Sequence, residues 1–273
     1  MFVGICSILN IIGFLLVKEL YLDEYNIDEV TEESLLLSDS HGLPLGDVSR
    51  FGVSNLSNAS DSYLDMERKL RFVLKNNKVK KVFLTVDDHT LSSYRDDLNN
   101  EDRSVVFTDL NSFENGLELF VEKYFRYYVI WFNPKYSSIL QQYIKGKKKS
   151  KKDKKKPWSS LNNNQRLEQS RGRFERQFSS RDTSVVMRES LEAIIQLCKD
   201  KGVELIGVKF PLAGEYNDLV GELSYGAEQI FYENKLKVVD FKRSPELNNS
   251  HFDNQDHLNK IGGNWLSKKI FTE

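Results

Sequence analysis

Residues 34–42 read SLLLSDSHG, a short apolar run that stops abruptly at a polar turn. This pattern is typical of a strand inside a parallel sheet, because helices cover both faces of such a sheet and leave only the strand end exposed. Residues 80–89 read KKVFLTVDDH and repeat the pattern more strongly. The two stretches therefore predict buried strands that each end in a group of polar side chains.

Further apolar runs predict three more strands, over residues 48–54, 203–210 and 236–241. Between the strands, apolar residues recur at helical spacing. Helices are expected over residues 63–74, 185–201, 227–233 and 259–271. This alternation predicts an α/β fold with three α/β/α layers around a mostly parallel, flavodoxin-like sheet of five strands. In such a sheet the functional groups lie at the carboxyl ends of the strands.

The composition is that of a globular protein. The 273 residues are 40% hydrophobic, 12% aromatic and 29% charged, which excludes a collagenous, mucin-like or wholly disordered chain. Residues 145–156 hold nine lysines and one aspartate, leaving 30 basic against 39 acidic side chains elsewhere, a net charge of -9. A nucleic-acid-binding surface spread over the domain is therefore not expected. Cys6 and Cys198 are too few for a disulfide framework or a CxxC metal site.

The amino-terminal residues predict a membrane segment. Residues 2–17 are apolar except for Ser7 and Asn10, and a charged stretch follows at once. At about 1.5 Å per residue, this helix is slightly short for a hydrocarbon core of ~30 Å. An uncleaved anchor, a signal-peptide core and a truncated start all stay open, as does a buried helix. We expect residues 1–18 to be an anchor or signal segment, and residues 19–273 to form one domain outside the cytoplasm, at the cell membrane.

Two stretches in the middle of the chain stand apart from the strand and helix pattern. Residues 113–132 have helical periodicity with an aromatic face, which predicts a helix packed against a core. From Lys145 to Asn164 the composition changes to lysine, then to serine and asparagine. Such a segment buries nothing, so we expect a mobile, solvated insertion that is dispensable for folding.

Polar clusters follow four of the predicted strands, at residues 39–41, 55–62, 87–89 and 253–259. Three of the four histidines lie in these clusters. A serine at a strand end can be exposed in a tight turn, and a histidine within hydrogen-bond reach can take its proton. The clusters therefore predict one site at the edge of the sheet, with Ser40 as nucleophile and His257 as base.

In this order, the clusters resemble the sequence blocks of the SGNH (GDSL-type) esterases and acyltransferases. The likeness is greatest to membrane-anchored members linked to O-acetylation of bacterial envelope polysaccharides. Ser38, Asp39 and Ser40 match the Gly-Asp-Ser block, which places Ser40 at the nucleophile. Residues 55–62, NLSNASDS, match the second block, with Ser60 where the family has its oxyanion glycine. His89 stands where the family has an asparagine donor.

The last block of the family, Asp-x-x-His, resembles residues 253–259, DNQDHLN. Asn254 stands three residues before His257, so the acid that orients the histidine stays open between Asp256 and Asp253. The resemblance implies acyl chemistry on Ser40 without a cofactor or a metal. It also implies an acylated carbohydrate or an acyl-donor membrane protein as partner, and no nucleic acid.

Two other functions stay open. Residues 39–42 also resemble the Asp-x-His-Gly opening of calcineurin-like metallophosphoesterases, in which Asp39 and His41 would bind a metal, but the further ligand segments of that family are missing. A non-catalytic, glycan-binding or scaffold protein of the same fold is the second alternative, since the glycine, asparagine and Asp-x-x-His positions are altered. Sequence spacing does not separate hydrolysis from transfer.

Overall fold

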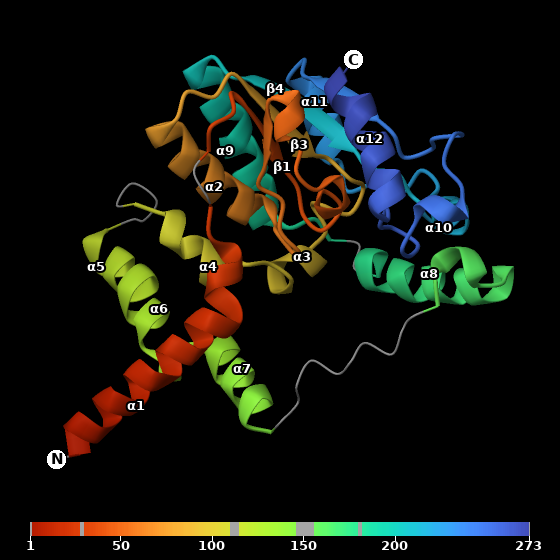
Figure 1. Ribbon diagram of the computed structural model, residues 1–273. Coiled ribbons are helices and arrows are strands. Elements are labelled where there is room, and N and C mark those ends of the chain that lie inside the picture. The colour runs from red at the N-terminus through yellow and green to blue at the C-terminus, as the bar shows by residue number, and fades with distance from the viewer. Residues whose placement is uncertain (1, 28–29, 110–114, 146–155, 180–181, 273) are drawn as a thin grey trace. The chain divides into compact units, whose positions relative to one another are not determined.

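The computed structural model describes residues 2–27, 30–109, 115–145, 156–179 and 182–272 (Figure 1). The chain divides into two compact units. The first is formed by Met1–Asp28 and Asn100–Lys155, and the second by Glu29–Asn99 and Lys156–Glu273. The sequence pattern did not predict this division, because residues far apart in the chain make up each unit.

The second unit contains the predicted sheet. Its strands are β1 (Ser34–Leu37), β2 (Val53–Asn55), β3 (Lys81–Thr85), β4 (Glu204–Lys209) and β5 (Lys237–Asp240). All neighbouring pairs are parallel, and the order across the sheet is β2-β1-β3-β4-β5. This is the flavodoxin-like order, so the predicted α/β fold class is confirmed.

Helices cover both faces of this sheet. Successive residues of a strand point to opposite faces. Leu36 belongs to a core cluster that includes Leu266 and Ile270 of α12 (Lys260–Thr272). The ring of Phe231 approaches Gly207 on the other face. That face carries α11 (Ala227–Glu233) together with α2 (Tyr63–Asn76) and α9 (Val185–Lys201), which pack against each other.

Some elements of the second unit were not predicted, namely α3 (Tyr94–Asp97), α8 (Asn163–Phe178) and α10 (Gly214–Val220). The longest is α8, which begins at a capping box of Asn162 and Gln165. Its buried side chains are Arg166, Ser170 and Gln177. A helix that buries polar side chains has no apolar stripe, which is why helical periodicity did not reveal it.

Two boundary predictions need correction. The second strand covers only Val53–Asn55, because Ser49–Phe51 form a 3-10 turn (η4) and Gly52 adopts a left-handed conformation with φ of 70°. The prediction of a solvated insertion is wrong at its carboxyl end, because Trp158 of η9 (Trp158–Ser160) is only 1% exposed and belongs to the core. Residues 146–155, which hold most of the lysines, lie outside the described residues.

The first unit is helical. The predicted apolar helix is α1 (Phe2–Val17), which continues through η1 (Lys18–Leu22) and η2 (Asp23–Tyr25). By length and composition alone, the helix Gly4–Tyr25 could cross a membrane. The remaining elements are α4 (Glu101–Ser104), η5 (Val105–Phe107), α5 (Gly116–Leu119), η7 (Phe120–Phe125), α6 (Arg126–Tyr128), η8 (Ile130–Phe132) and α7 (Pro134–Ile144).

The prediction of one core-packed helix over residues 113–132 is wrong. The described part, from Gly116 on, is broken into α, π and 3-10 segments. Its aromatic side chains Phe120, Tyr124, Phe125, Tyr128 and Trp131 are exposed. Ile130 is the buried residue of this stretch, in a cluster with Val17, Leu22 and Tyr136.

Two helical glycines give a test of how α12 packs. A methyl group at Gly263 would collide with the backbone of Pro44, whereas a methyl group at Gly172 in α8 has nothing within 4 Å. We expect Gly263→Ala to lower the free energy of unfolding by about 1–3 kcal/mol, as overpacking does. Gly172→Ala should raise it by about 0.5–1 kcal/mol, since alanine favours a helix. Urea denaturation of the full chain in detergent measures both, and equal effects would contradict this packing.

Candidate active site

The predicted polar clusters meet at the carboxyl ends of β1 and β3. These strands are neighbours in the sheet, but β1 connects along the chain to β2 on its other side. This change of direction is a topological switch point, where open α/β sheets form a crevice for ligands. Ser40 follows β1, and the cluster of Asp87, Asp88 and His89 follows β3.

The structure brings Ser40 and His257 together although 217 residues separate them. The Nε2 atom of His257 lies 2.7 Å from the Oγ atom of Ser40. The other ring nitrogen, Nδ1, lies 2.9 Å from the Oδ1 atom of Asp256. Ser40 is partly exposed. Serine, histidine and carboxylate are thus arranged in the order of a catalytic triad.

The conformation of the turn that holds His257 shows which of the two aspartates lies beside its ring. Asn254 accepts the backbone N–H of Asp256 and that of His257, each at 3.0 Å, and its Oδ1 atom is also 3.0 Å from Nδ1 of His257. This turn directs Asp256 toward the ring. Asp253 is exposed, and no hydrogen bond or ion pair joins its carboxylate to His257 in the described part of the chain. The geometry therefore favours Asp256 as the orienting acid.

Asp256 is itself held by an arginine that sequence reasoning missed. The Nε atom of Arg173, in α8, donates to the Oδ2 atom of Asp256 at 2.5 Å. Burial raises the pKa of Asp256, but the hydrogen bond from His257 and the charges around it outweigh burial and hold the pKa well below its usual value. Asp256 is therefore a carboxylate with one oxygen for His257 and one for Arg173. No local signal marks Arg173, because it lies on a polar helix 83 residues away.

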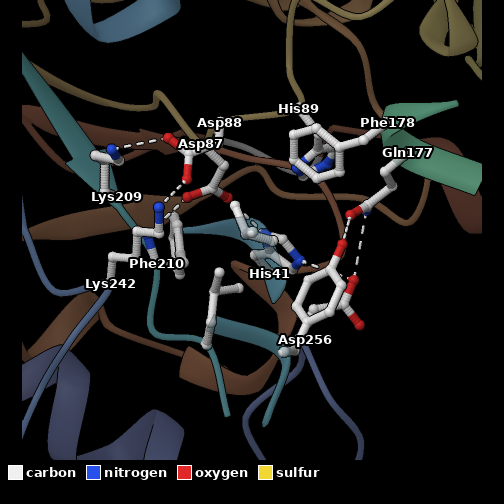
Figure 2. Close-up of a pocket in the computed structure, with 13 residues that line it drawn as sticks. His41, Asp87, Asp88, His89, Gln177, Phe178, Lys209, Phe210, Lys242 and Asp256 are labelled. Carbon is white, nitrogen blue, oxygen red and sulfur yellow. Dashed lines mark hydrogen bonds and ion pairs between the residues drawn. The ribbon is translucent and has the colours of Figure 1, made fainter. Parts of the chain in front are cut away.

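Beneath the Ser40 and His257 pair lies a buried imidazolium, that of His41. Its Nδ1 atom is 2.5 Å from Oδ2 of Asp87, and its Nε2 atom is 3.7 Å from Oδ2 of Asp256. Figure 2 shows His41 between these two carboxylates. Burial lowers the pKa of His41, but the charges of Asp39 and Asp87 outweigh it and hold the pKa well above its usual value.

His89, which the family resemblance places at an oxyanion donor, belongs to the same buried cluster. Its Nε2 atom lies 3.7 Å from Oδ2 of Asp39, and its ring meets that of His41 edge to face, with centroids 5.5 Å apart. Burial lowers the pKa of His89, and this outweighs the carboxylate of Asp39, which acts in the opposite sense. Among the described residues no hydrogen bond joins His89 to Ser40, and its role as a donor stays a prediction.

Ser60 adopts the backbone conformation that the family's glycine would favour. Its φ of 68° lies in the left-handed region, which residues other than glycine seldom occupy. Arg95 stabilises this turn by donating to the carbonyl of Ser60 at 3.3 Å and to that of Asp61. Within the described residues, the backbone N–H groups of Ser40 and Ser60 make no hydrogen bond. Both are therefore available to a negatively charged oxygen.

The same side chains include two groups with metal-ligand chemistry. Asp39, His41 and Asp87 offer donor atoms within 4.8 Å of one another, and so do His41, Asp256 and His257. Both groups depend on His41. A protonated imidazole is no ligand, so a metal would first have to displace the proton that Asp39 and Asp87 stabilise.

No protein-family model matches the sequence, and no curated protein matches it at a significant level. Eight chains of solved structures are similar to this chain, and three of them follow. A protein assigned to the G-D-S-L family of lipolytic proteins from Desulfitobacterium hafniense DCB-2 has 10% identity and a TM-score of 0.42, over 88% of this chain and 99% of its own. A protein assigned as an acylhydrolase from Bacteroides fragilis NCTC 9343 has 10% identity and a TM-score of 0.40, over 94% of each chain.

The third, a GDSL-like lipase from Bacteroides thetaiotaomicron VPI-5482, has 8% identity and a TM-score of 0.39, over 95% of this chain and 94% of its own. Similarity at this level decides neither the family nor the chemistry of this chain. The arrangement of its own side chains has to do so.

The buried imidazolium predicts a pH dependence. We expect ¹⁵N NMR of the full chain to show His41 still protonated well above pH 6.5 and His89 neutral. Because the folded-state pKa of His41 is raised, its stabilisation is complete below the unfolded pKa and is lost as pH rises through the folded pKa. The melting temperature should therefore fall on the alkaline side.

His41→Gln should make the fall in melting temperature at alkaline pH smaller. The difference should be about 2–4 °C for each kcal/mol of pH-dependent stability that His41 contributes. Asp39 and Asp256 have lowered pKa values and act in the opposite sense, since their stabilisation is present at neutral pH and is lost as pH falls through the folded pKa. An imidazole of His41 that loses its proton at or below pH 6.5 would contradict the buried imidazolium.

Proposed function

We propose that this protein is a serine-dependent esterase or O-acyltransferase of the SGNH type. The observation that supports it most directly is the 2.7 Å contact between Ser40 Oγ and His257 Nε2, with Asp256 on the far side of the ring. A hydroxyl becomes an effective nucleophile when a base within hydrogen-bond distance takes its proton during attack. The partly exposed Ser40, at the switch point of the sheet, meets that condition.

The reaction follows from these positions. The Oγ atom of Ser40 attacks the ester carbonyl while Nε2 of His257 takes its proton, and Asp256 stabilises the imidazolium that forms. The N–H groups of Ser40 and Ser60 donate to the oxyanion, and each such donor lowers the barrier by roughly 2.7–4 kcal/mol. His257 then gives its proton to the leaving alcohol. Water releases the acyl group in an esterase, and an acceptor hydroxyl takes it in a transferase.

For the substrate we propose an acylated glycan of the cell envelope, with an acyl-donor membrane protein as a further partner in the transferase case. The sequence blocks at Ser40, Ser60 and His257 and the apolar helix α1 support this choice together. We also propose that α1 anchors the chain in the cell membrane and that the second unit lies outside the cytoplasm, where such a glycan is found.

Covalent labelling tests the nucleophile. A serine-directed fluorophosphonate should label the full-length protein, and Ser40→Ala should abolish labelling. His257→Ala should lower it by about 10³-fold or more, since the base and nucleophile act as one unit. Ser38→Ala is the matched control, because its buried hydroxyl has no hydrogen-bond partner in the described structure.

Labelling should be unchanged in that control. An adduct that persists in Ser40→Ala would contradict the assignment. A folded protein that takes no label would favour the non-catalytic alternative, and metal-dependent phosphatase activity would favour the metallophosphoesterase.

A second pair of variants tests the orienting acid. Asp256→Asn removes the charge that stabilises the His257 imidazolium, and loss of such a carboxylate lowers kcat by about 10⁴-fold in a serine triad. Asp253→Asn is the control three residues earlier, and its side chain is exposed. Hydrolysis of p-nitrophenyl acetate should fall severely in the first variant and hardly change in the second. The reverse order would assign the role to Asp253.

A further inference from the structure

The first unit exposes large apolar side chains over its whole length. Outside α1, the exposed residues include Trp131 at 60% and Ile144 at 80% of their surfaces. The others among the described residues are Leu20, Val106, Leu117, Phe120, Tyr124, Phe125, Tyr128, Phe132 and Tyr143. A surface that faces only water seldom holds so many large apolar groups together. A partner or medium of low polarity is therefore expected at this surface.

The segment 127–140 is bound to the middle of α1. Asn10 donates to the carbonyl of Tyr128 at 2.9 Å and accepts the N–H of Ile130 at 3.1 Å. The ring of Phe14 packs on Tyr128 with centroids 5.1 Å apart, and the side chain of Ile130 lies against Gly13. The turn at residues 128–130 thus supplies hydrogen-bond partners for Asn10, the polar side chain in the middle of α1. These contacts hold the turn beside α1.

Only one side of α1 is used in this packing. Val17 is fully buried, whereas Ile5, Ile8, Leu9, Ile11, Ile12 and Leu15 are all exposed by half or more. The exposed side of α1 and the exposed rings of 117–144 belong to one compact unit. Tyr128 packs on Phe14 of α1 and is itself 48% exposed, so α1 and the segment bound to it both present apolar surface.

We propose that residues 117–144 form a second membrane contact beside α1, reaching from the turn bound to α1 to the boundary between lipid headgroups and acyl chains. The proposal rests on the membrane anchoring proposed above for α1. Tryptophan and tyrosine rings prefer this boundary, since one part of the ring is apolar and the other is polar. An exposed ion pair, Arg126 with Glu122 at 2.9 Å, lies in the same segment. Paired charges are costly in hydrocarbon, so the part of the segment that carries this pair lies at headgroup level, while the turn bound to α1 lies deeper.

Photocrosslinking of the full chain tests this contact. The photoreactive residue p-benzoylphenylalanine is introduced in three separate variants, at Trp131, at Ile8 of α1 and at Tyr232. Tyr232 lies in the second unit and is 52% exposed, close to the exposure of Trp131, so it serves as the control. Each variant is reconstituted into vesicles of phosphatidylcholine and phosphatidylglycerol and irradiated. Lipid adducts should form at Trp131 and Ile8 roughly tenfold or more above the level at Tyr232.

The outcomes separate this proposal from those it rests on. Lipid adducts at Ile8 but not at Trp131 would overturn the second contact and leave the anchor intact. Adducts at neither position would overturn both. A protein adduct at Trp131, to a second copy of the chain or to another protein, would also overturn it. Fluorophosphonate labelling of Ser40 in the same vesicles reports on the acyl chemistry separately, and far-UV circular dichroism shows that each variant is folded.

Discussion

The arrangement of the site depends on one buried cation, the imidazolium of His41. It lies after β1, its Nδ1 atom is bound to Asp87 after β3, and its Nε2 atom faces Asp256 on the loop near the carboxyl terminus. Asp87 in turn accepts the backbone N–H of Phe210, directly after β4, at 2.7 Å. His41 and the carboxylates beside it therefore join the ends of three strands to the loop that carries His257. Buried charges of one sign would repel one another and destabilise this edge of the sheet. The cluster therefore depends on having positive and negative side chains next to one another.

This constraint explains how a histidine late in the chain meets a serine near its start. The Oδ2 atom of Asp256 faces both Arg173 and His41, while its Oδ1 atom faces His257. Two cations, Arg173 and His41, thus fix the position of this carboxylate, which also contacts the base His257. Arg173 acts through Asp256 and is a positioning residue, and it makes α8 part of the site although that helix is polar and lies far away in sequence.

The two units have different surfaces and different tasks. The second unit buries its apolar residues on the two faces of a sheet and concentrates charge at one edge. The first unit exposes rings and branched aliphatic side chains around α1. A membrane contact formed by both α1 and the bound segment 117–144 would hold the first unit more firmly than one helix alone, because interfacial aromatic anchors restrain tilt and rotation. Such a contact suits a protein whose proposed substrate lies in the cell envelope.

The sequence by itself determined the five strands, most of the helices that cover them, and the edge of the sheet at which the polar groups gather. It could do so because a buried parallel strand is a continuous apolar run and a covering helix has an apolar stripe. The same patterns failed for α8, whose buried face is polar, and for residues 113–132, whose aromatic face is exposed. Periodicity reports which residues share a side of a helix, and it does not report what that side faces.

For the site, the sequence predicted Ser40, Ser60, His89, His257 and a choice of two acids. The tertiary structure decided between Asp253 and Asp256, since both are near His257 along the chain and only the direction of each side chain separates them. That direction is set by the Asn254 turn and by Arg173, 83 residues away. The structure also placed His89 in a buried cluster with His41. Charges that meet only after folding have no signature in local spacing, because their partners come from different strands and helices.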